Sequence, residues 1–511
     1  MRTFEEKSRS QSVAAKEPAG VVPAAQQSGE AVADDARLSV RLKAIYAGGF
    51  FGQTVLQNAF YCFVMLFYTD VVALSPQLVG IALAIGRVFD AVTNPAIGQI
   101  SDRTNTRFGR RRPYIMLGSI FWGATFVTLW LALPVWSQGS KFAYLVAVDV
   151  SYALGAALFI VPYLALGAEL SLDYDERSSI AGYRIAFMQV GQVVGAAMLT
   201  LTILIRDQTA HWEKVGSGGF ASHVPHLLKA LPNVEWSLAG ILLAVVSVAG
   251  MFLSGLIPKE RFATRSASGF TSWVAFKTTL SNRNFVRVVA TYVTYYGFTS
   301  LGNFMLPYLL VYYVKKPSYL LPAYAILAVS GVATLPLWLK LGRILEKSVI
   351  LRIACVWMAT ACPLSLVLFS PSYPWLIFLL AFWAGSGQAA FETYSHSLLG
   401  DVTDEDEMRT GQRREGMYFG VYNLLLKLAI SLGLMWSGFA LAVVRYVPNG
   451  QQSTATLWGM RLLYAVPFLF IPLGLVYLRS YSLDRGQLAA VQKDLRETQS
   501  RRGPLPGPVA D

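Results

Sequence analysis

Residues 113–136 read PYIMLGSIFWGATFVTLWLALPVW and contain no charged side chain. Residues 236–258, WSLAGILLAVVSVAGMFLSGLIP, form a second uncharged run. An α-helix needs about 20 apolar residues to cross the roughly 30 Å hydrocarbon core of a bilayer. Both runs are long enough, so the sequence predicts a protein with membrane-spanning helices.

Ten further apolar segments have comparable lengths. They lie at about 44–72, 77–100, 142–168, 183–205, 285–314, 319–340, 349–369, 374–400, 417–444 and 456–479. The sequence therefore predicts an all-α membrane protein with twelve transmembrane helices. We expect, in chain order, a disordered tail (1–40), a six-helix bundle (41–258), a cytosolic middle loop (259–284), a second six-helix bundle (285–480) and a tail (481–511).

The composition excludes most other classes of protein. Of 511 residues, 54% are hydrophobic and only 14% are charged, whereas about a quarter of the residues in a soluble domain are charged. The net charge of +13 lies in short loops between apolar runs, which favours attraction to anionic lipid over nucleic-acid binding. We find no pattern typical of a catalytic motif, a zinc site or a disulfide framework, so we expect neither an enzyme nor a cofactor.

The distribution of basic residues predicts the orientation. With the N-terminus inside, most of the 43 Lys and Arg residues fall in the cytosolic tails and loops. Short cytosolic loops are enriched in Lys and Arg. We therefore expect a multi-pass protein of the cell membrane with both termini in the cytosol.

An internal repeat indicates two related halves. ELSLDYDERS (169–178) follows the fourth apolar segment, and DVTDEDEMRT (401–410) follows the tenth. Acidic, aliphatic and hydroxyl residues recur in the same order before an arginine. Many secondary transporters consist of such repeated halves.

Charged residues inside the spans are candidates for function, because burying a charge in a bilayer is costly. Arg87, Asp90 and Asn94 share one helical stripe, which suits a cation or a polar solute; the alternative is a structural Arg87–Asp90 pair. Lys427 lies near mid-membrane, and we expect Asp90, or failing that Glu392, to be its partner.

Other polar residues fall at helical spacing on the spans. Thr54 and Asn58 offer hydrogen bonds without charge, which suits a neutral hydroxylated ligand, and Tyr163 and Gln189 could extend this lining. The alternative for each is a helix–helix hydrogen bond. Glu392 and His396, four residues later, share a face, which indicates either a proton-linked role or a structural histidine. Glu392 is also a candidate substrate-binding carboxylate.

Charged loops also predict a cytosolic gate between the halves. Its candidate members are Asp102, Arg103, Arg110, Glu169, Arg177, Asp401 and Arg409. Opposite charges on two halves can close one end of a transporter and release it when the halves rock. The alternative is that these charges only set the topology.

The chain resembles the glycoside–pentoside–hexuronide:cation symporters, the melibiose permease family of the major facilitator superfamily. The resemblance covers about residues 40–480 and rests on several short motifs. They are FYTDV (67–71), RVFDAVTNPAIG (87–98), RFGRRRP (107–113), DVTD (401–404) and RREG (413–416) leading to Lys427.

This resemblance implies the major facilitator fold, and it implies a role for three residues. Asp90 and Lys427 would belong to the cation and sugar region, and Arg184 would lie near the sugar. The chain departs from the melibiose permease pattern at Asn94, which replaces a second cation-site aspartate, and at Thr54 and Ile160, which replace sugar-binding acids. The coupling ion therefore stays open between H⁺ and a Na⁺ near Asp90, and the alternative to coupled transport is uniport.

We accordingly predict a secondary transporter, acting as a monomer, that moves a glycoside or other sugar derivative by alternating access with a coupled cation. Its partners would be a small-molecule solute and the lipid bilayer, without nucleic acid. One alternative is a symporter of lysolipids or other amphiphiles from the same superfamily. An alternative of another class is a membrane sensor or scaffold that does not transport.

Overall fold

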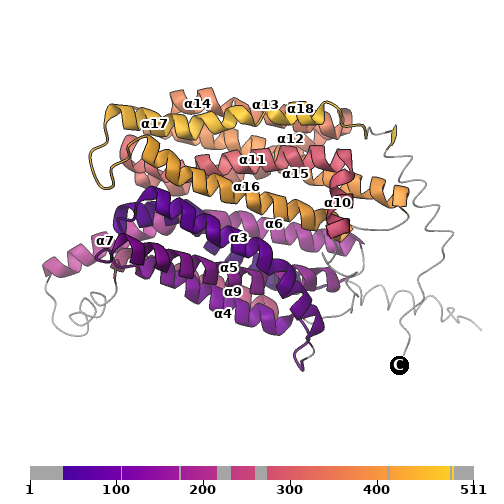
Figure 1. Cartoon of the computed structure of the whole chain (residues 1–511), viewed down its shortest axis with the longest axis horizontal. Coiled ribbons are helices and arrows are strands. Elements are labelled where there is room, and N and C mark those ends of the chain that lie inside the picture. The colour runs from indigo at the N-terminus through magenta and orange to yellow at the C-terminus, as the bar shows by residue number, and fades with distance from the viewer. Residues whose placement is uncertain are drawn as a thin grey trace, which may run out of the picture.

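The computed structural model describes residues 38–104, 106–171, 174–215, 232–258, 273–410, 415–483 and 486–487. Most of the two predicted tails therefore lies outside the described residues. The described chain is helical throughout, and its long helices run roughly parallel to one another (Figure 1).

The N-terminal half contains six helical segments. They are α2 (Val40–Leu66) with the π-helical turn η1 (Phe67–Val71), α3 (Pro76–Arg103), α4 (Arg112–Thr128) with η2 (Leu129–Leu131), α5 (Gln138–Glu169), α6 (Tyr174–Ala196) with α7 (Met198–Val215), and α9 (Val234–Leu256).

The C-terminal half contains a short helix and six longer segments. They are α10 (Trp273–Ser281), α11 (Arg283–Tyr308) with η3 (Leu309–Tyr313), η4 (Pro317–Tyr319) with α12 (Leu320–Ile344), α13 (Lys347–Ala359) with α14 (Ala361–Leu368), η5 (Pro374–Leu376) with α15 (Ile377–Thr410), α16 (Glu415–Val443), and α17 (Thr454–Ala465) with η6 (Val466–Phe470) and α18 (Leu473–Leu478). The short helix α10 lies within the stretch predicted as the middle loop.

Eleven of the described segments are long and apolar enough to cross a membrane. The twelfth, α11 with η3, is equally long, but Tyr, Thr and Asn residues lower its mean hydropathy. Large apolar side chains such as Leu117 and Val443 are exposed on the outside of the bundle, Val443 to 81%. Such a surface suits contact with lipid, whereas soluble proteins rarely expose large apolar patches.

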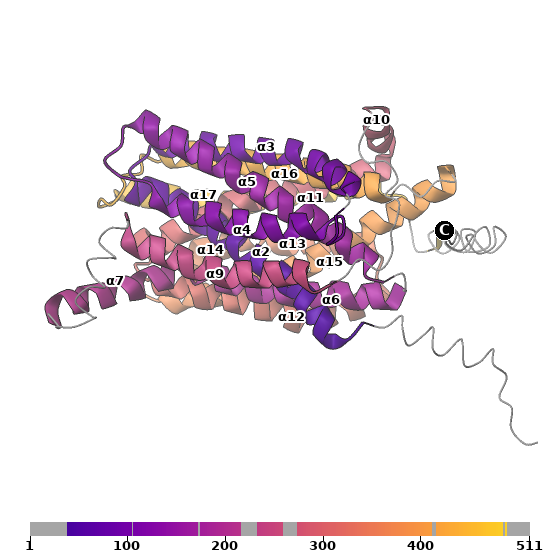
Figure 2. The same cartoon turned by 90° about the horizontal axis from the view of Figure 1, so that it is seen from below.

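The two halves lie side by side and meet along three helix pairs. The indigo-to-magenta half lies below the orange-to-yellow half in Figure 1, and Figure 2 shows the same bundle turned by 90°. Helix α3 packs on α16, α2 on α11, and α6 on α12. Glycines permit the closest approach: a Cβ atom on Gly80 of α3 would lie 2.7 Å from the carbonyl oxygen of Met435 on α16.

The ends of α2 and α11 have the same unusual backbone. Each helix finishes in a π-helical turn, η1 or η3. Each turn is followed by a residue with positive φ, Ala73 at 58° and Lys315 at 57°. This repeated irregularity supports the predicted duplication, because a non-glycine residue with positive φ is uncommon.

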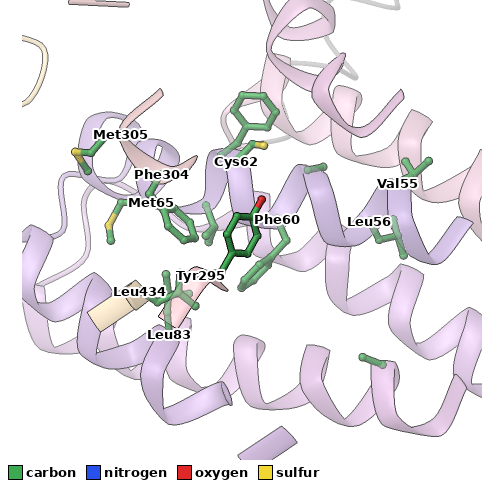
Figure 3. Close-up of a cluster of buried hydrophobic side chains, with 14 of the residues drawn as sticks. Val55, Leu56, Phe60, Cys62, Met65, Leu83, Tyr295, Phe304, Met305 and Leu434 are labelled. Atoms are coloured by element: carbon green, nitrogen blue, oxygen red, sulfur yellow. The ribbon is translucent and has the colours of Figure 1, made fainter. Parts of the chain in front are cut away.

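A buried apolar layer fills the junction of the halves. Figure 3 shows Phe60 and Met65 of α2 close to Leu83 of α3, Phe304 of α11 and Leu434 of α16. These five side chains are essentially inaccessible to solvent. The layer lies between the middle of the bundle and the end at which Asp70 closes η1.

We call the end carrying Asp70 the Asp70 end, and the opposite end, where Arg103 and Arg112 flank the α3–α4 link, the basic end. The sequence predicts that the basic end faces the cytosol.

Candidate functional site

An ion pair joins the two halves in the middle of the bundle. The Nζ atom of Lys427 on α16 lies 2.7 Å from Oδ2 of Asp90 on α3. The Asp90 side chain is 7% exposed and that of Lys427 is 30% exposed. The Asn94 side-chain amide donates to Asp90 Oδ1 at 3.3 Å. The structure thus brings Lys427 to the partner that the sequence favoured.

Arg87 has a different partner from the one expected on its own helix. Its Nη2 atom lies 2.9 Å from Oδ1 of Asp149 on α5, and both side chains are buried. The alternative of an Arg87–Asp90 pair is therefore wrong. The guanidinium also lies over the rings of Phe60 and Tyr152, at 5.1 and 5.8 Å from their centroids. Arg87 thus fixes α3 to α5 and leaves Asp90 to Lys427.

The polar residues predicted on α2 and α5 mostly bond to helix backbone. Thr54 donates to the Phe50 carbonyl oxygen at 2.7 Å, and Asn58 donates to the Gln192 carbonyl oxygen at 2.6 Å. The hydroxyls of Tyr163 and Tyr46 each donate to the other residue's carbonyl oxygen. Asn58 and Tyr163 thus join α2 to α6 and α5, whereas the Thr54 bond stays within α2.

Two further predicted residues, Arg184 and Gln189, lie on α6. The Arg184 guanidinium lies over the Phe50 ring at 4.9 Å, and its Nε atom is buried without a hydrogen-bond partner. The Gln189 amide reaches α12, where a Cβ atom on Gly331 would lie 3.9 Å from its nitrogen. Gln189 therefore lies where the two halves meet, whereas Arg184 packs on α2 of its own half.

Glu392 on α15 collects donors from α11. Tyr292 donates to its Oε2 atom at 2.7 Å, and Tyr296 donates to Oε1. His396 lies one turn further along, with Nδ1 3.7 Å from Glu392 Oε2. The Glu392 and His396 side chains are 28% and 49% exposed. The second choice of partner for Lys427 thus forms a separate cluster.

A cavity of about 90 Å³ lies beside this cluster, between α11, α12, α15 and α17. Apolar residues and aromatic rings form most of its wall. The polar lining residues are Tyr295, Tyr296, Thr299, Asn303, Tyr324, Gln388 and Tyr464. The Tyr324 hydroxyl lies 3.1 Å from the sulfur of Cys62 on α2, so the cavity borders the junction of the halves. An apolar wall with a few hydrogen-bonding groups is the lining found in small-molecule sites, but the cavity is smaller than the roughly 300–1,000 Å³ of such sites.

The sequence analysis did not single out the residues of this cavity. Their signal is the composition of α11, RNFVRVVATYVTYYGFTSLGNFMLPY, in which Tyr, Thr and Asn interrupt the apolar pattern. A spanning helix carries such residues at little cost only where they line a cavity or bond to neighbours. The low mean hydropathy of α11 was therefore a signal in the sequence for the helix that contributes most polar groups to the cavity.

The predicted cytosolic gate is only partly described. The side chains of Asp102, Glu169 and Arg177 lie outside the described residues. Arg103 is exposed and Arg110 half-exposed.

The ion pairs that the structure describes at the remaining gate positions join residues of one half. Lys347 pairs with Asp401 at 2.7 Å, and Arg409 pairs with Glu405 at 2.6 Å. A latch between the halves at this end stays a prediction.

The opposite end has a hydrogen-bonded contact between the halves. Asp70 of η1 accepts from Tyr312 of η3 at 2.5 Å, from Thr69 at 2.7 Å and from Tyr446. Asn449 donates to the Asp70 carbonyl oxygen. Burial and the Asp70 carboxylate raise the pKa of Tyr446 in the α16–α17 link, so its phenol keeps the proton that it donates.

The described chain thus forms two halves of six long helical segments each, with charges buried where the halves meet, an architecture typical of secondary transporters. The sequence pattern of the family described as MFS/sugar transport protein matches residues 45–485. The chain belongs to this family; it is a multi-pass membrane symporter and not an enzyme.

Curated relatives align over nearly the whole chain. An uncharacterized symporter of Synechocystis sp., sll1374, is 29% identical, with 91% of this chain and 97% of the relative covered. YagG of Escherichia coli, named as a glycoside/cation symporter, is 26% identical over 86% of this chain and 90% of its own length. The sodium-dependent lysophosphatidylcholine symporter 1-B of Danio rerio is 25% identical, with 90% of each chain covered.

Solved structures share the fold. The nucleoside transporter NupG, as its D323A mutant, matches with a TM-score of 0.57 at 12% identity, covering 86% of this chain and 99% of its own. The xylose transporter XylE of E. coli, in an inward open conformation, matches with a TM-score of 0.55 at 13% identity, covering 88% and 98%.

Proposed function

We propose that the protein transports a glycoside by cation-coupled symport, with Asp90 and Lys427 as the coupling pair. The observation that carries the proposal is the 2.7 Å contact between these residues, because it joins the two halves at mid-bundle. When an ion pair links two halves that move relative to each other, the binding of a cation to its carboxylate can control that movement.

The coupling follows from competition for one carboxylate. A proton or a Na⁺ ion arriving at Asp90 would remove or share the negative charge that holds Lys427. Lys427 would then be free to bind solute or to move with its half. Asp90 and Asn94 supply carboxylate and amide oxygens, which suit a hard cation, although the Asn94 amide group here donates to Asp90.

The solute would bind in and around the cavity beside Glu392. Tyr296, Asn303, Tyr324 and Gln388 supply hydrogen-bonding groups at its wall, while Gln189 approaches the junction of the halves from α6. Alternating hydroxyl, amide and aromatic groups suit a hydroxylated ring.

The name of YagG supports a glycoside, whereas the name of the Danio rerio relative supports the second candidate, a lysolipid. The test is uptake by proteoliposomes of labelled methyl glycosides and of lysophosphatidylcholine, each with an imposed Na⁺ or pH gradient. Gradient-driven uptake of a glycoside that lysophosphatidylcholine does not inhibit supports the proposal. Uptake of the lysolipid alone would replace the glycoside by the second candidate.

A further inference from the structure

Glu392 lies about midway along α15, where a carboxylate is costly to hold. Two phenol hydroxyls, of Tyr292 and Tyr296, donate to its oxygens. A carboxylate can accept about four hydrogen bonds, so part of its capacity stays available. At 28% exposed, the side chain is accessible to a small polar group.

The other two carboxylates in the middle of the spans each have a cationic partner. Asp90 pairs with Lys427, and Asp149 pairs with Arg87. Over the described part of the chain, the single basic side chain within 4 Å of Glu392 is His396. The Nδ1 atom of His396 also lies 3.0 Å from the carbonyl oxygen of Glu392 on its own helix. Among the residues that the structure describes, Glu392 is therefore the mid-membrane carboxylate that has no Lys or Arg within 4 Å to balance its charge.

Aromatic rings surround this carboxylate. The Tyr292 ring centroid lies 4.8 Å from that of Tyr296, 4.9 Å from Tyr422 and 5.5 Å from His396. The faces of aromatic rings carry negative potential and attract cations such as an ammonium group. The rings and the carboxylate thus favour the same kind of ligand.

We propose that Glu392, with Tyr292, Tyr296 and Tyr422, forms a subsite for an ammonium group on the transported solute. The inference rests on the proposed function and narrows its substrate to solutes carrying an amine or a quaternary ammonium beside their hydroxyl groups. The hydroxyl-bearing part would lie in the adjoining cavity, whose wall includes Tyr296.

The chemistry of the cluster favours an ammonium group over a bound metal ion. The described residues contain no group of three or more His, Cys, Asp or Glu side chains able to hold a metal. The phenols of Tyr292 and Tyr296 already act as donors to the carboxylate. The rest of the cluster consists of ring faces, and ring faces suit an organic cation.

The test compares ligands that differ in one charge. Purified full-length protein in detergent is titrated calorimetrically with methyl 2-amino-2-deoxyglucoside and with methyl glucoside. A second pair, lysophosphatidylcholine and lysophosphatidylglycerol, distinguishes an ammonium on a sugar from one on a lipid headgroup. We expect the ammonium-bearing member of one pair to bind about tenfold more tightly, as one charge-assisted contact provides.

Substitutions assign the preference to its residue. Glu392→Gln keeps the size of the side chain and an acceptor for the tyrosines, and it should reduce the preference to within about twofold. Glu407→Gln makes the same change further along α15, towards the basic end, and should keep the preference. If Glu392→Gln lowers the affinity for both ligands of a pair equally, Glu392 has a structural role and the subsite proposal is overturned.

The comparison in wild-type protein needs no variant, so a Glu392→Gln protein that fails to fold leaves the test intact. Absence of any charge preference in both pairs overturns the inference. If the protein takes up a neutral glycoside but shows no preference for the ammonium-bearing ligands, the subsite is overturned and the proposed function stands. Binding with the preference but without uptake would remove the proposed function and keep the subsite.

Discussion

Asp70 and Tyr312 occupy equivalent positions in the two halves and bond directly to each other, Tyr312 donating to Asp70 Oδ2 at 2.5 Å. They are 242 residues apart, the spacing that also separates the positive-φ residues Ala73 and Lys315. One half thus supplies a carboxylate and the other a phenol on the same backbone turn. Two carboxylates would repel each other, whereas acceptor and donor close this end of the bundle.

Weakening this contact should open the Asp70 end. In Tyr312→Phe the carboxylate loses one donor, and a hydrogen bond to a charged group contributes about 1.5–3 kcal/mol, or about tenfold or more in the population of the open state. Cys62 reports the change, because it is buried beside Tyr324 at the edge of the apolar layer. The experiment uses a protein in which the other two cysteines are replaced by serine. In that background we expect Tyr312→Phe to accelerate the alkylation of Cys62 by N-ethylmaleimide about tenfold.

The matched control is Tyr373→Phe, which removes a phenol hydroxyl from an exposed residue of the α14–η5 link. Its alkylation rate should equal that of the parent protein. An unchanged rate in Tyr312→Phe would show that the apolar layer alone keeps this end closed.

Much of the architecture could be predicted from the sequence, because apolar length and loop charge are local properties. The uncharged run at 113–136 covers α4 and η2, which end at Leu131. The pairing of Lys427 with Asp90 also followed from simple physics, since a lone mid-membrane ammonium needs a carboxylate from another helix.

Other parts of the site depend on three-dimensional packing. The pairing of Arg87 with Asp149 rather than with Asp90 depends on how α5 packs against α3. The bonds that occupy Tyr163 and Asn58 depend on which backbone carbonyls the fold brings near them. The cavity lining from α11 was missed because tyrosines in a spanning helix could equally be packing residues.

Replacing one member of the Asp90–Lys427 pair should lower the melting temperature more than replacing both members. Asp90→Asn leaves a partly buried ammonium, and Lys427→Gln leaves a buried carboxylate, each without its counter-ion. We expect either single variant to lower gradient-driven uptake at least about tenfold, as the loss of one ionic contact of about 1.5–3 kcal/mol implies. The measurement is initial uptake by proteoliposomes, alongside thermal unfolding of the purified protein.

The double variant Asp90→Asn with Lys427→Gln distinguishes coupling from stability. Its melting temperature should exceed that of both single variants, because no uncompensated charge remains. Its uptake should nevertheless no longer depend on the imposed cation gradient. Retained gradient dependence would move the coupling site elsewhere.

Gly86→Ala should disrupt the Arg87–Asp149 pair without touching either charged residue. A Cβ atom at Gly86 would collide with the Asp149 carboxylate, and Asp149 is fully buried within α5. Displacing one member of a buried ion pair costs about 3–5 kcal/mol, so thermal unfolding should shift strongly downwards.

Gly182→Ala is its matched control, because no atom lies within 4 Å of a Cβ atom there and alanine favours a helix by up to about 1 kcal/mol over glycine. Its melting temperature should stay the same or rise. Equal melting temperatures for Gly86→Ala and the parent protein would show that α5 yields easily and that the pair contributes little.

Asn303→Ala should weaken solute binding while leaving the fold intact. Asn303 is an exposed residue of α11 that lines the cavity, so its removal takes away a hydrogen-bonding group and creates no buried defect. One neutral hydrogen bond contributes about 0.5–1.5 kcal/mol, so the solute concentration for half-maximal uptake should rise about two- to tenfold at a similar maximal rate. Gln451→Ala, in the exposed α16–α17 link, should leave both values unchanged. A half-maximal concentration that does not change in Asn303→Ala would place the hydroxylated part of the solute outside this cavity, towards Arg184 and Gln189 on α6.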